Sequence, residues 1–98
     1  MAEIRVTPSE LRSKADELEQ LNRQFQQEVT SMVGYEQELA GMWEGEAQKA
    51  FRKAFNDDKQ KMDLFAQNIE KYVQALRADA QKYEEAEQRN IGIATTRK

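Results

Sequence analysis

Gly41-Met42-Trp43-Glu44-Gly45 is the stretch that decides the fold, because it places the only tryptophan of the chain between two glycines near the middle of the sequence. Long, charged segments with helical periodicity lie before and after it. Glycine adopts the backbone angles that a helix end needs, so Gly41 is expected just past one helix and Gly45 just before the next. The stretch therefore predicts a helix, a tight turn and a second helix.

The composition indicates one small helical domain. The chain has 98 residues, of which 39% are hydrophobic and 34% charged, with one proline and four glycines. Such a chain is near the lower size limit for building a core unaided. The net charge is −3 and the charges are interspersed, whereas a nucleic-acid-binding protein would carry a clustered basic face. We expect no nucleic-acid partner.

Cysteine and histidine are both absent. Their absence excludes disulfides, thiol and imidazole catalysis and the commonest ligands of transition metals. No serine has a partner base visible in the sequence, and a narrow helical bundle offers no large cavity for a substrate. We therefore expect no enzyme activity, no cofactor, no metal and no small-molecule substrate.

No stretch of the sequence approaches the roughly 20 apolar residues that a membrane span requires. The first six residues, Met1 to Val6, contain no apolar run typical of a signal peptide. The expectation is a protein that stays in the cytosol or leaves the cell without a conventional signal peptide.

A first helix is predicted at about residues 8–40. Thr7-Pro8-Ser9-Glu10 combines a capping threonine, a proline suited to the first helical position and a glutamate placed to close a capping box. Apolar residues then recur every seven positions, which is the period of helices that pack at a shallow angle. This row consists of Leu11, Leu18, Phe25, Met32 and Leu39.

A second helix is predicted at about residues 46–88. Its apolar residues form two adjacent rows, which are Phe55, Met62, Ile69, Leu76 and Tyr83, and Phe51, Phe65 and Tyr72. Asp58 and Asp79 interrupt the second row, so they are expected at a solvated edge, or Asp58 fixes the register. Residues 89–98 lose the repeat and are expected to fray into a flexible tail.

The two rows predict an all-α, antiparallel helix-turn-helix hairpin. If position i faces position 87 minus i, Leu11 meets Leu76 and Leu18 meets Ile69, and we expect this register to hold within one turn. Each helix carries two apolar rows, and one neighbour covers only part of that surface. We therefore expect two hairpins to dimerise into an elongated four-helix bundle, with a poorly folded monomer.

Trp43-Glu44-Gly45, midway along a chain of about a hundred residues and between two amphipathic helices, resembles the W-x-G hundred-residue family of small type VII (ESX) secretion substrates. The opening Thr-Pro-Ser-Glu-Leu and the run from Trp43 to Phe51 also resemble this family. The likeness therefore covers nearly the whole chain.

The resemblance implies helical hairpins that dimerise, lack a cleaved signal peptide and are exported folded by a membrane ATPase machine. It also implies a second export element, Y-x-x-x-D/E, which Tyr83 and Glu87 fit. It implies a protein that is secreted or associated with the cell surface. An antiparallel dimer would place Tyr83 of one copy beside Trp43 of the other, and the dimer is either self-paired or formed with a sister chain.

Two readings stay open for the turn and for the function. Trp43 is a recognition residue, or it seals the end of the bundle, whereas Gly45 is expected to be structural because a side chain there would crowd the helix start. The leading function is a secreted type VII substrate that is possibly also required for the export of partner substrates. The alternatives are a helical adaptor that is not secreted and a chaperone-like partner of a larger helical protein.

Overall fold

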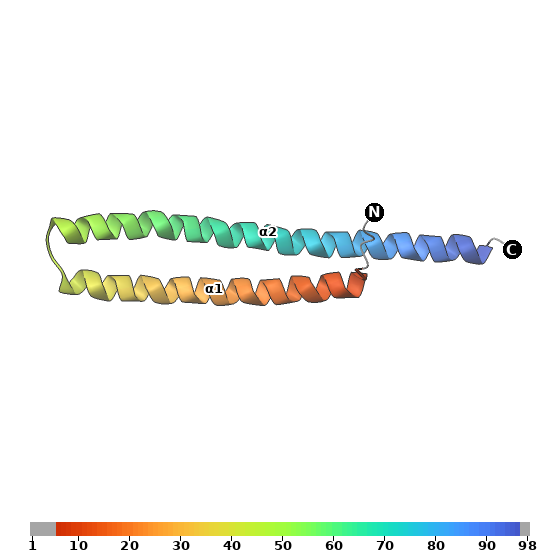
Figure 1. Ribbon diagram of the computed structural model, residues 1–98, viewed down its shortest axis with the longest axis horizontal. Helices are drawn as coiled ribbons and strands as arrows, with labels where there is room; N and C mark the ends of the chain where they lie inside the picture. Colours follow the sequence, from red (N-terminus) through yellow and green to blue (C-terminus); the bar gives the residue numbers. More distant parts are fainter. Residues whose placement is uncertain (1–5, 97–98) are drawn as a thin grey trace.

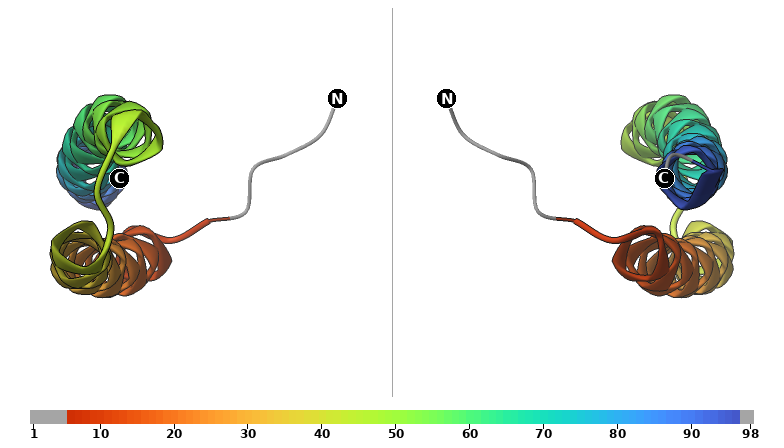
Figure 2. Two further views of the ribbon diagram at one scale, coloured as in Figure 1. Left: turned by 90° about the vertical axis from the view of Figure 1, so that its left-hand side faces the viewer. Right: turned by 90° about the vertical axis from the view of Figure 1, so that its right-hand side faces the viewer.

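The computed structural model describes residues 6–96, and their side chains as far as residue 89. Two helices, α1 (Pro8–Met42) and α2 (Glu46–Thr96), run antiparallel and side by side as an elongated hairpin (Figures 1 and 2). The hairpin measures 82 × 22 × 19 Å, and residues 6–96 contain no strand. The predicted all-α antiparallel hairpin is confirmed.

The start of α1 follows from its capping residues. The Thr7 Oγ1 atom accepts a hydrogen bond from the Glu10 backbone N–H at 3.0 Å, and Pro8 lies in the first turn. The threonine satisfies one of the amides that a helix leaves without an internal partner, and proline has no such amide to satisfy. The helix therefore begins at the predicted residue.

The turn is shorter than predicted. α1 continues through Gly41 to Met42, and Trp43 follows in an extended conformation (φ −132°, ψ 133°). The expected helix end at residue 40, with Gly41 just beyond it, is therefore wrong. Gly41 can remain helical because glycine lowers helix stability by only about 1 kcal/mol relative to alanine.

Gly45 is the residue that needs to be glycine, because its φ is +110°. A Cβ atom at this position would meet nothing within 4 Å, so crowding is not the reason that the sequence suggested. The left-handed backbone angle is the reason, since residues with a side chain rarely adopt it.

Gly45→Ala is expected to lower the free energy of unfolding by about 1–2 kcal/mol through this backbone strain. Urea unfolding followed by circular dichroism measures the change. Gly41→Ala, in the last turn of α1, is the control and should be neutral or slightly stabilising. Equal stability of Gly45→Ala and the parent chain would contradict this explanation of the turn.

Three polar contacts define how the helices face each other. The Asn22 Nδ2 group donates to the Ala66 carbonyl at 3.0 Å, and Arg52 Nε lies 2.9 Å from Glu36 Oε1. Next to the turn, a side-chain N–H of Gln48 donates to the carbonyl of Ala40 at 2.9 Å. In each pair the two residue numbers add up to 88, against the predicted 87. The predicted register is therefore correct within the stated turn.

The interior of the hairpin is a row of mostly small residues, here called the seam. Its buried members recur every seven residues, as Pro8, Ala15, Asn22, Val29 and Glu36 on α1 and Ala66, Val73 and Ala80 on α2. Small side chains at the line of closest approach let the two helices come close together. The seam therefore holds the hairpin together along most of α1.

The predicted core residues flank this seam and are not fully buried. Seven are half-buried, namely Leu11, Leu18, Phe25, Phe55, Met62, Ile69 and Leu76. The other five are exposed, namely Met32, Leu39, Phe51, Phe65 and Tyr72. Within one chain the large apolar rows are thus only partly covered.

α2 runs on to Thr96, so the predicted frayed tail from residue 89 is wrong for residues 89–96. No proline interrupts this segment, and a long helix extends by one more hydrogen bond for each residue added. α1 begins at Pro8, opposite Ala80, so α2 projects about four turns beyond its partner (Figure 1).

Asn22 is a buried polar residue with an incomplete set of partners. Only 4% of it is exposed, and its Oδ1 atom has no hydrogen-bond partner. A buried acceptor without a partner lowers stability, whereas a buried polar residue in a helix interface can fix the register. Asn22 therefore favours a unique register at the expense of stability.

Asn22→Val is expected to raise the free energy of unfolding by about 1 kcal/mol, because it removes the unpartnered acceptor and adds apolar surface to the seam. Urea unfolding at one fixed protein concentration tests this. Gln24→Val, at an exposed position of the same helix, is the control. A variant that is less stable than the parent by 1 kcal/mol or more would show that the bond to Ala66 dominates.

Candidate functional site

The turn presents an aromatic pair. The Trp43 ring lies against Phe51, with ring centroids 5.8 Å apart and planes inclined by 51°, and 36% of Trp43 is exposed. Glu44 and Gly45 are both exposed. The α2 ladder starts immediately afterwards, because Lys49 N–H donates to the Gly45 carbonyl at 3.2 Å. The tryptophan is thus held at the tip of the hairpin with one part of its ring accessible.

Tyr83 and Glu87 lie one turn apart on α2, where α1 no longer covers it. Glu87 occupies the same helical row as the buried Val73 and Ala80, yet it is exposed because its level lies beyond the start of α1. Tyr83 is 42% exposed. The Y-x-x-x-E element is therefore an accessible stripe on a helix surface.

A set of ion pairs joins the start of α1 to the part of α2 that precedes this stripe. Arg12 contacts Glu84 at 2.5 Å. Arg77 contacts Asp16 at 2.9 Å and also contacts Glu19. Hydrogen bonds from Asp16 and then Glu19 raise the pKa of Arg77 above its ordinary value. These pairs lie along one long side of the hairpin, and the large apolar residues lie along the other.

The structure does not bring the two elements together within one chain. Trp43 is at the turn, and Tyr83 is 37 residues beyond the first residue of α2. At about 1.5 Å per residue, this separation is roughly 55 Å. A site that combines both elements would need a second chain.

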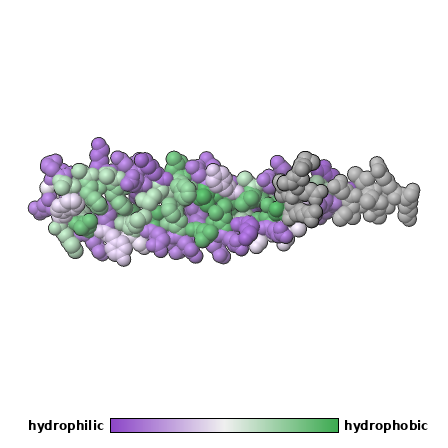
Figure 3. All heavy atoms as spheres, viewed as in Figure 1, coloured by the Kyte–Doolittle hydropathy of each residue, from purple (hydrophilic) through white to green (hydrophobic). Residues whose placement is uncertain are grey.

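The apolar side of the hairpin is the largest uncovered feature. Figure 3 shows a hydrophobic band along the visible side, bordered by hydrophilic residues. Its most accessible large side chains in the helices, each at least half exposed, are Leu21, Tyr35, Met42, Leu64, Phe65 and Tyr72. A continuous apolar stripe on a small protein marks an interaction surface.

Within residues 6–96, the structure places no three acidic side chains close enough together to suggest a metal site. Neither helix, over the same residues, contains a stretch apolar enough to cross a membrane. The candidate site is accordingly a pair of recognition elements joined by an apolar surface.

Comparison with known families decides which proteins share this arrangement. The family described as "Proteins of 100 residues with WXG" matches residues 3–88. The chain belongs to this WXG100 family. Trp43-Glu44-Gly45 supplies the sequence for which the family is named, at the turn of the hairpin.

Relatives of known name support the same conclusion. Type VII secretion system extracellular protein A of Staphylococcus aureus, in strains USA300 and Newman, is 32% identical over 96 residues, covering 95% of this chain and 99% of the relative. Two crystal structures of the secreted protein EsxB from Bacillus anthracis share the WXG100 hairpin. One is 30% identical with a TM-score of 0.77 and covers 89% of this chain and 99% of its own. The wild-type form is 31% identical, with a TM-score of 0.75, and covers 86% and 97%.

The seam residues are the part of the site region that the sequence interpretation did not select. Asn22 and Glu36 are polar, and Ala66 and Ala80 are small, so none of them ranks as core by hydrophobicity. Their shared spacing of seven was the available signal, because it runs parallel to the large apolar rows.

Proposed function

We propose that this chain is a small substrate exported by a type VII secretion system. The observation that carries the proposal is a W-x-G turn at the tip of a helical hairpin in a WXG100 chain whose relatives are named as secreted or extracellular proteins. The protein acts through its surfaces and not as an enzyme. A membrane ATPase of the secretion machine is the partner that receives it.

The exported form is a dimer of hairpins. The exposed large residues on one side of the hairpin would remain in water in a single chain, and a second hairpin covers them. Burial of one large apolar side chain stabilises by roughly 1.5–3 kcal/mol, so several such residues outweigh the entropy lost on association. These residues include the twelve predicted core positions, which then form the core of the bundle.

Antiparallel copies explain how two distant elements act as one signal. Trp43 of one copy lies beside Tyr83 and Glu87 of the other, because the turn of each hairpin reaches the projecting end of its partner. The signal is complete only in the folded dimer, so unfolded or single chains are not exported.

Charge also favours antiparallel copies. Glu28 and Asp58 lie at nearly the same level of the hairpin, on its outer edges. If both turns pointed the same way, α1 would lie on the partner's α2 and these acids would face each other. Like charges across an interface are unfavourable.

Export is tested by assaying the culture supernatant for the intact protein in cells with and without the export ATPase. The expected result is protein in the supernatant only when the ATPase is present, with equal amounts inside both kinds of cell at an early time. Equal release without the ATPase would contradict the proposal, and retention in both cells would favour an adaptor role. A cytosolic protein without export elements controls for lysis.

A further inference from the structure

The apolar face contains an internal repeat of two hollows. One, of about 210 Å³, is lined by Leu18, Leu21, Asn22, Phe25, Phe65 and Ile69. The other, of about 180 Å³, is lined by Met32, Tyr35, Glu36, Leu39, Phe51 and Phe55. Every residue of the second hollow lies fourteen positions from its counterpart in the first, later in α1 and earlier in α2. The face is therefore built on a seven-residue ladder with two matching cups.

Charged residues occupy the ladder positions between and beyond these cups. The outer row of α1 reads Lys14, Leu21, Glu28 and Tyr35, and that of α2 reads Phe51, Asp58, Phe65 and Tyr72. A residue of α2 lies opposite the α1 residue whose number completes 88. Glu28 and Asp58 therefore share one level, near 28–30, and Lys14 and Tyr72 share another, near 14–16.

We propose that these four residues select self-pairing in a single register, with the two-fold axis at the level of Leu21 and Phe65. This inference rests on the proposed antiparallel dimer. Antiparallel copies placed face to face set α1 on the partner's α1 and α2 on the partner's α2. With the axis between levels 21 and 23, Lys14 meets Glu28 of the second copy, and Tyr72 meets its Asp58. By symmetry each contact occurs twice.

The same register fills the uncovered apolar surface. Leu21 and Phe65, which are 60% and 52% exposed, lie at the axis and enter the matching cup of the second copy. The middle of α1 is residue 25 and the middle of α2 is residue 71, at level 17, so their mean level is 21. The two rods therefore overlap along almost their whole length, and Trp43 reaches the level of Glu87 in the second copy.

Other antiparallel registers leave charges without partners. Moving the partner by one heptad sets Glu28 against Leu21 and Asp58 against Phe65. Moving it by two heptads sets Glu28 against Glu28 and brings the two Asp58 carboxylates close together. A carboxylate that faces an apolar residue or another carboxylate weakens association. The acids thus act as markers of register in a face that otherwise repeats every seven residues.

Charge exchange tests the inference in a homodimer. Lys14→Glu sets two glutamates against each other twice per dimer, and Glu28→Lys sets two lysines against each other twice. Each single variant is expected to dimerise about tenfold or more weakly than the parent. A mixture of the two variants restores both contacts, because each chain then supplies the charge that the other lacks. The double variant Lys14→Glu/Glu28→Lys restores them within one sequence.

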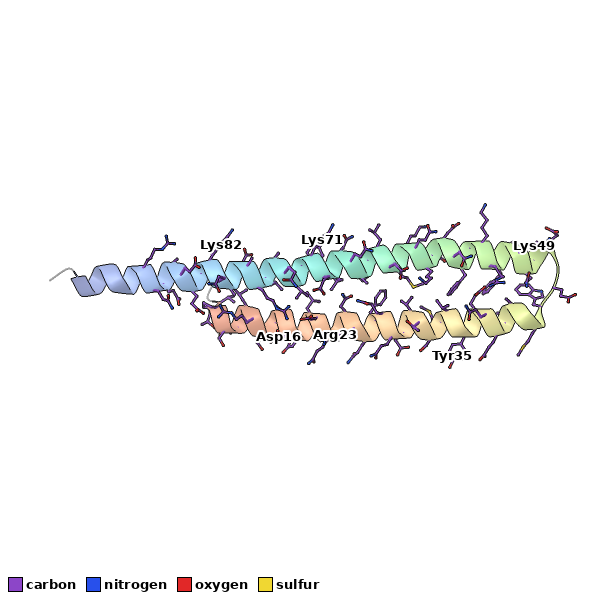
Figure 4. The ribbon with its side chains drawn as sticks, turned by 180° about the vertical axis from the view of Figure 1, so that it is seen from behind. Asp16, Arg23, Tyr35, Lys49, Lys71 and Lys82 are labelled. Carbon is purple, nitrogen blue, oxygen red and sulfur yellow. The ribbon has the colours of Figure 1, made fainter. Side chains whose placement is uncertain are left out.

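Sedimentation equilibrium over a dilution series provides the readout. Controls with the same charge changes are Lys71→Glu and Glu38→Lys, both exposed and away from the two long faces, and Figure 4 shows Lys71 pointing away from α1. The controls should dimerise like the parent. Single variants that dimerise like the parent, or a mixture that recovers no affinity, would overturn the register while leaving the dimer intact. A parent that stays monomeric would overturn the proposed dimer itself.

Discussion

Val73→Asp is expected to unfold most of the hairpin. Val73 is fully buried in the seam, between the two helices, where a carboxylate would lose its water and gain no partner. An uncompensated buried charge lowers the free energy of unfolding by about 3–5 kcal/mol, which is a large part of the 5–15 kcal/mol available to a small domain. Circular dichroism at 222 nm should lose most of its helical signal at neutral pH.

Gln74→Asp is the matched control, because Gln74 is the next residue and is exposed. It introduces the same side chain into the same helix, so its helical signal should stay close to that of the parent. A Val73→Asp chain with full helicity and an unchanged unfolding midpoint would contradict the seam as the interior of the hairpin.

Trp43→Ala is expected to abolish export while the protein stays helical and dimeric. Trp43 is partly exposed and packs on Phe51, so its loss removes little of the buried core. Truncating a tryptophan at the centre of a recognition site weakens binding by about 2 kcal/mol or more, which is roughly thirtyfold. The supernatant should therefore contain little of the variant, although cells accumulate it normally.

Met42→Ala is the control for this variant, because Met42 is the neighbouring residue and is 83% exposed. Tyr83→Ala should reduce export as strongly as Trp43→Ala, and the double variant should export no less than either single one. Such non-additivity is the mark of two residues that form one site. A Trp43→Ala dimer that is exported like the parent would remove the turn from the export signal.

The sequence predicts the hairpin well because several independent signals agree. Thr7 and Pro8 mark the helix start, Gly45 marks the turn, and the apolar period of seven places the register within one residue number of the observed value. Signals of this kind are local, so they survive without knowledge of the packing.

The interior was harder to predict, for a physical reason. Hydrophobicity selects Phe25 and Leu18 as core, but two helices approach most closely where side chains are small, as at Ala15 and Ala66. The larger residues are displaced to the flanks, where a second copy is needed to bury them. The end of α2 was missed because Gly92 was read as a helix breaker, whereas glycine only lowers helix stability.

Trp43, Tyr83 and Glu87 were predictable as a site only through their spacing and the family resemblance. The structure places them on accessible surfaces at opposite ends of the hairpin. Their direct assembly depends on a second chain, which no periodicity within one sequence describes. That assembly is the central claim of the proposed function.

The most direct test of this claim is the distance between two spin labels attached at Glu44→Cys, since the natural chain has no cysteine. In the antiparallel dimer the two turns lie at opposite ends, so double electron–electron resonance should give a separation of roughly 60–70 Å at about 1.5 Å per residue. A distance below about 30 Å would mean that the two turns lie together, and it would contradict the composite export signal.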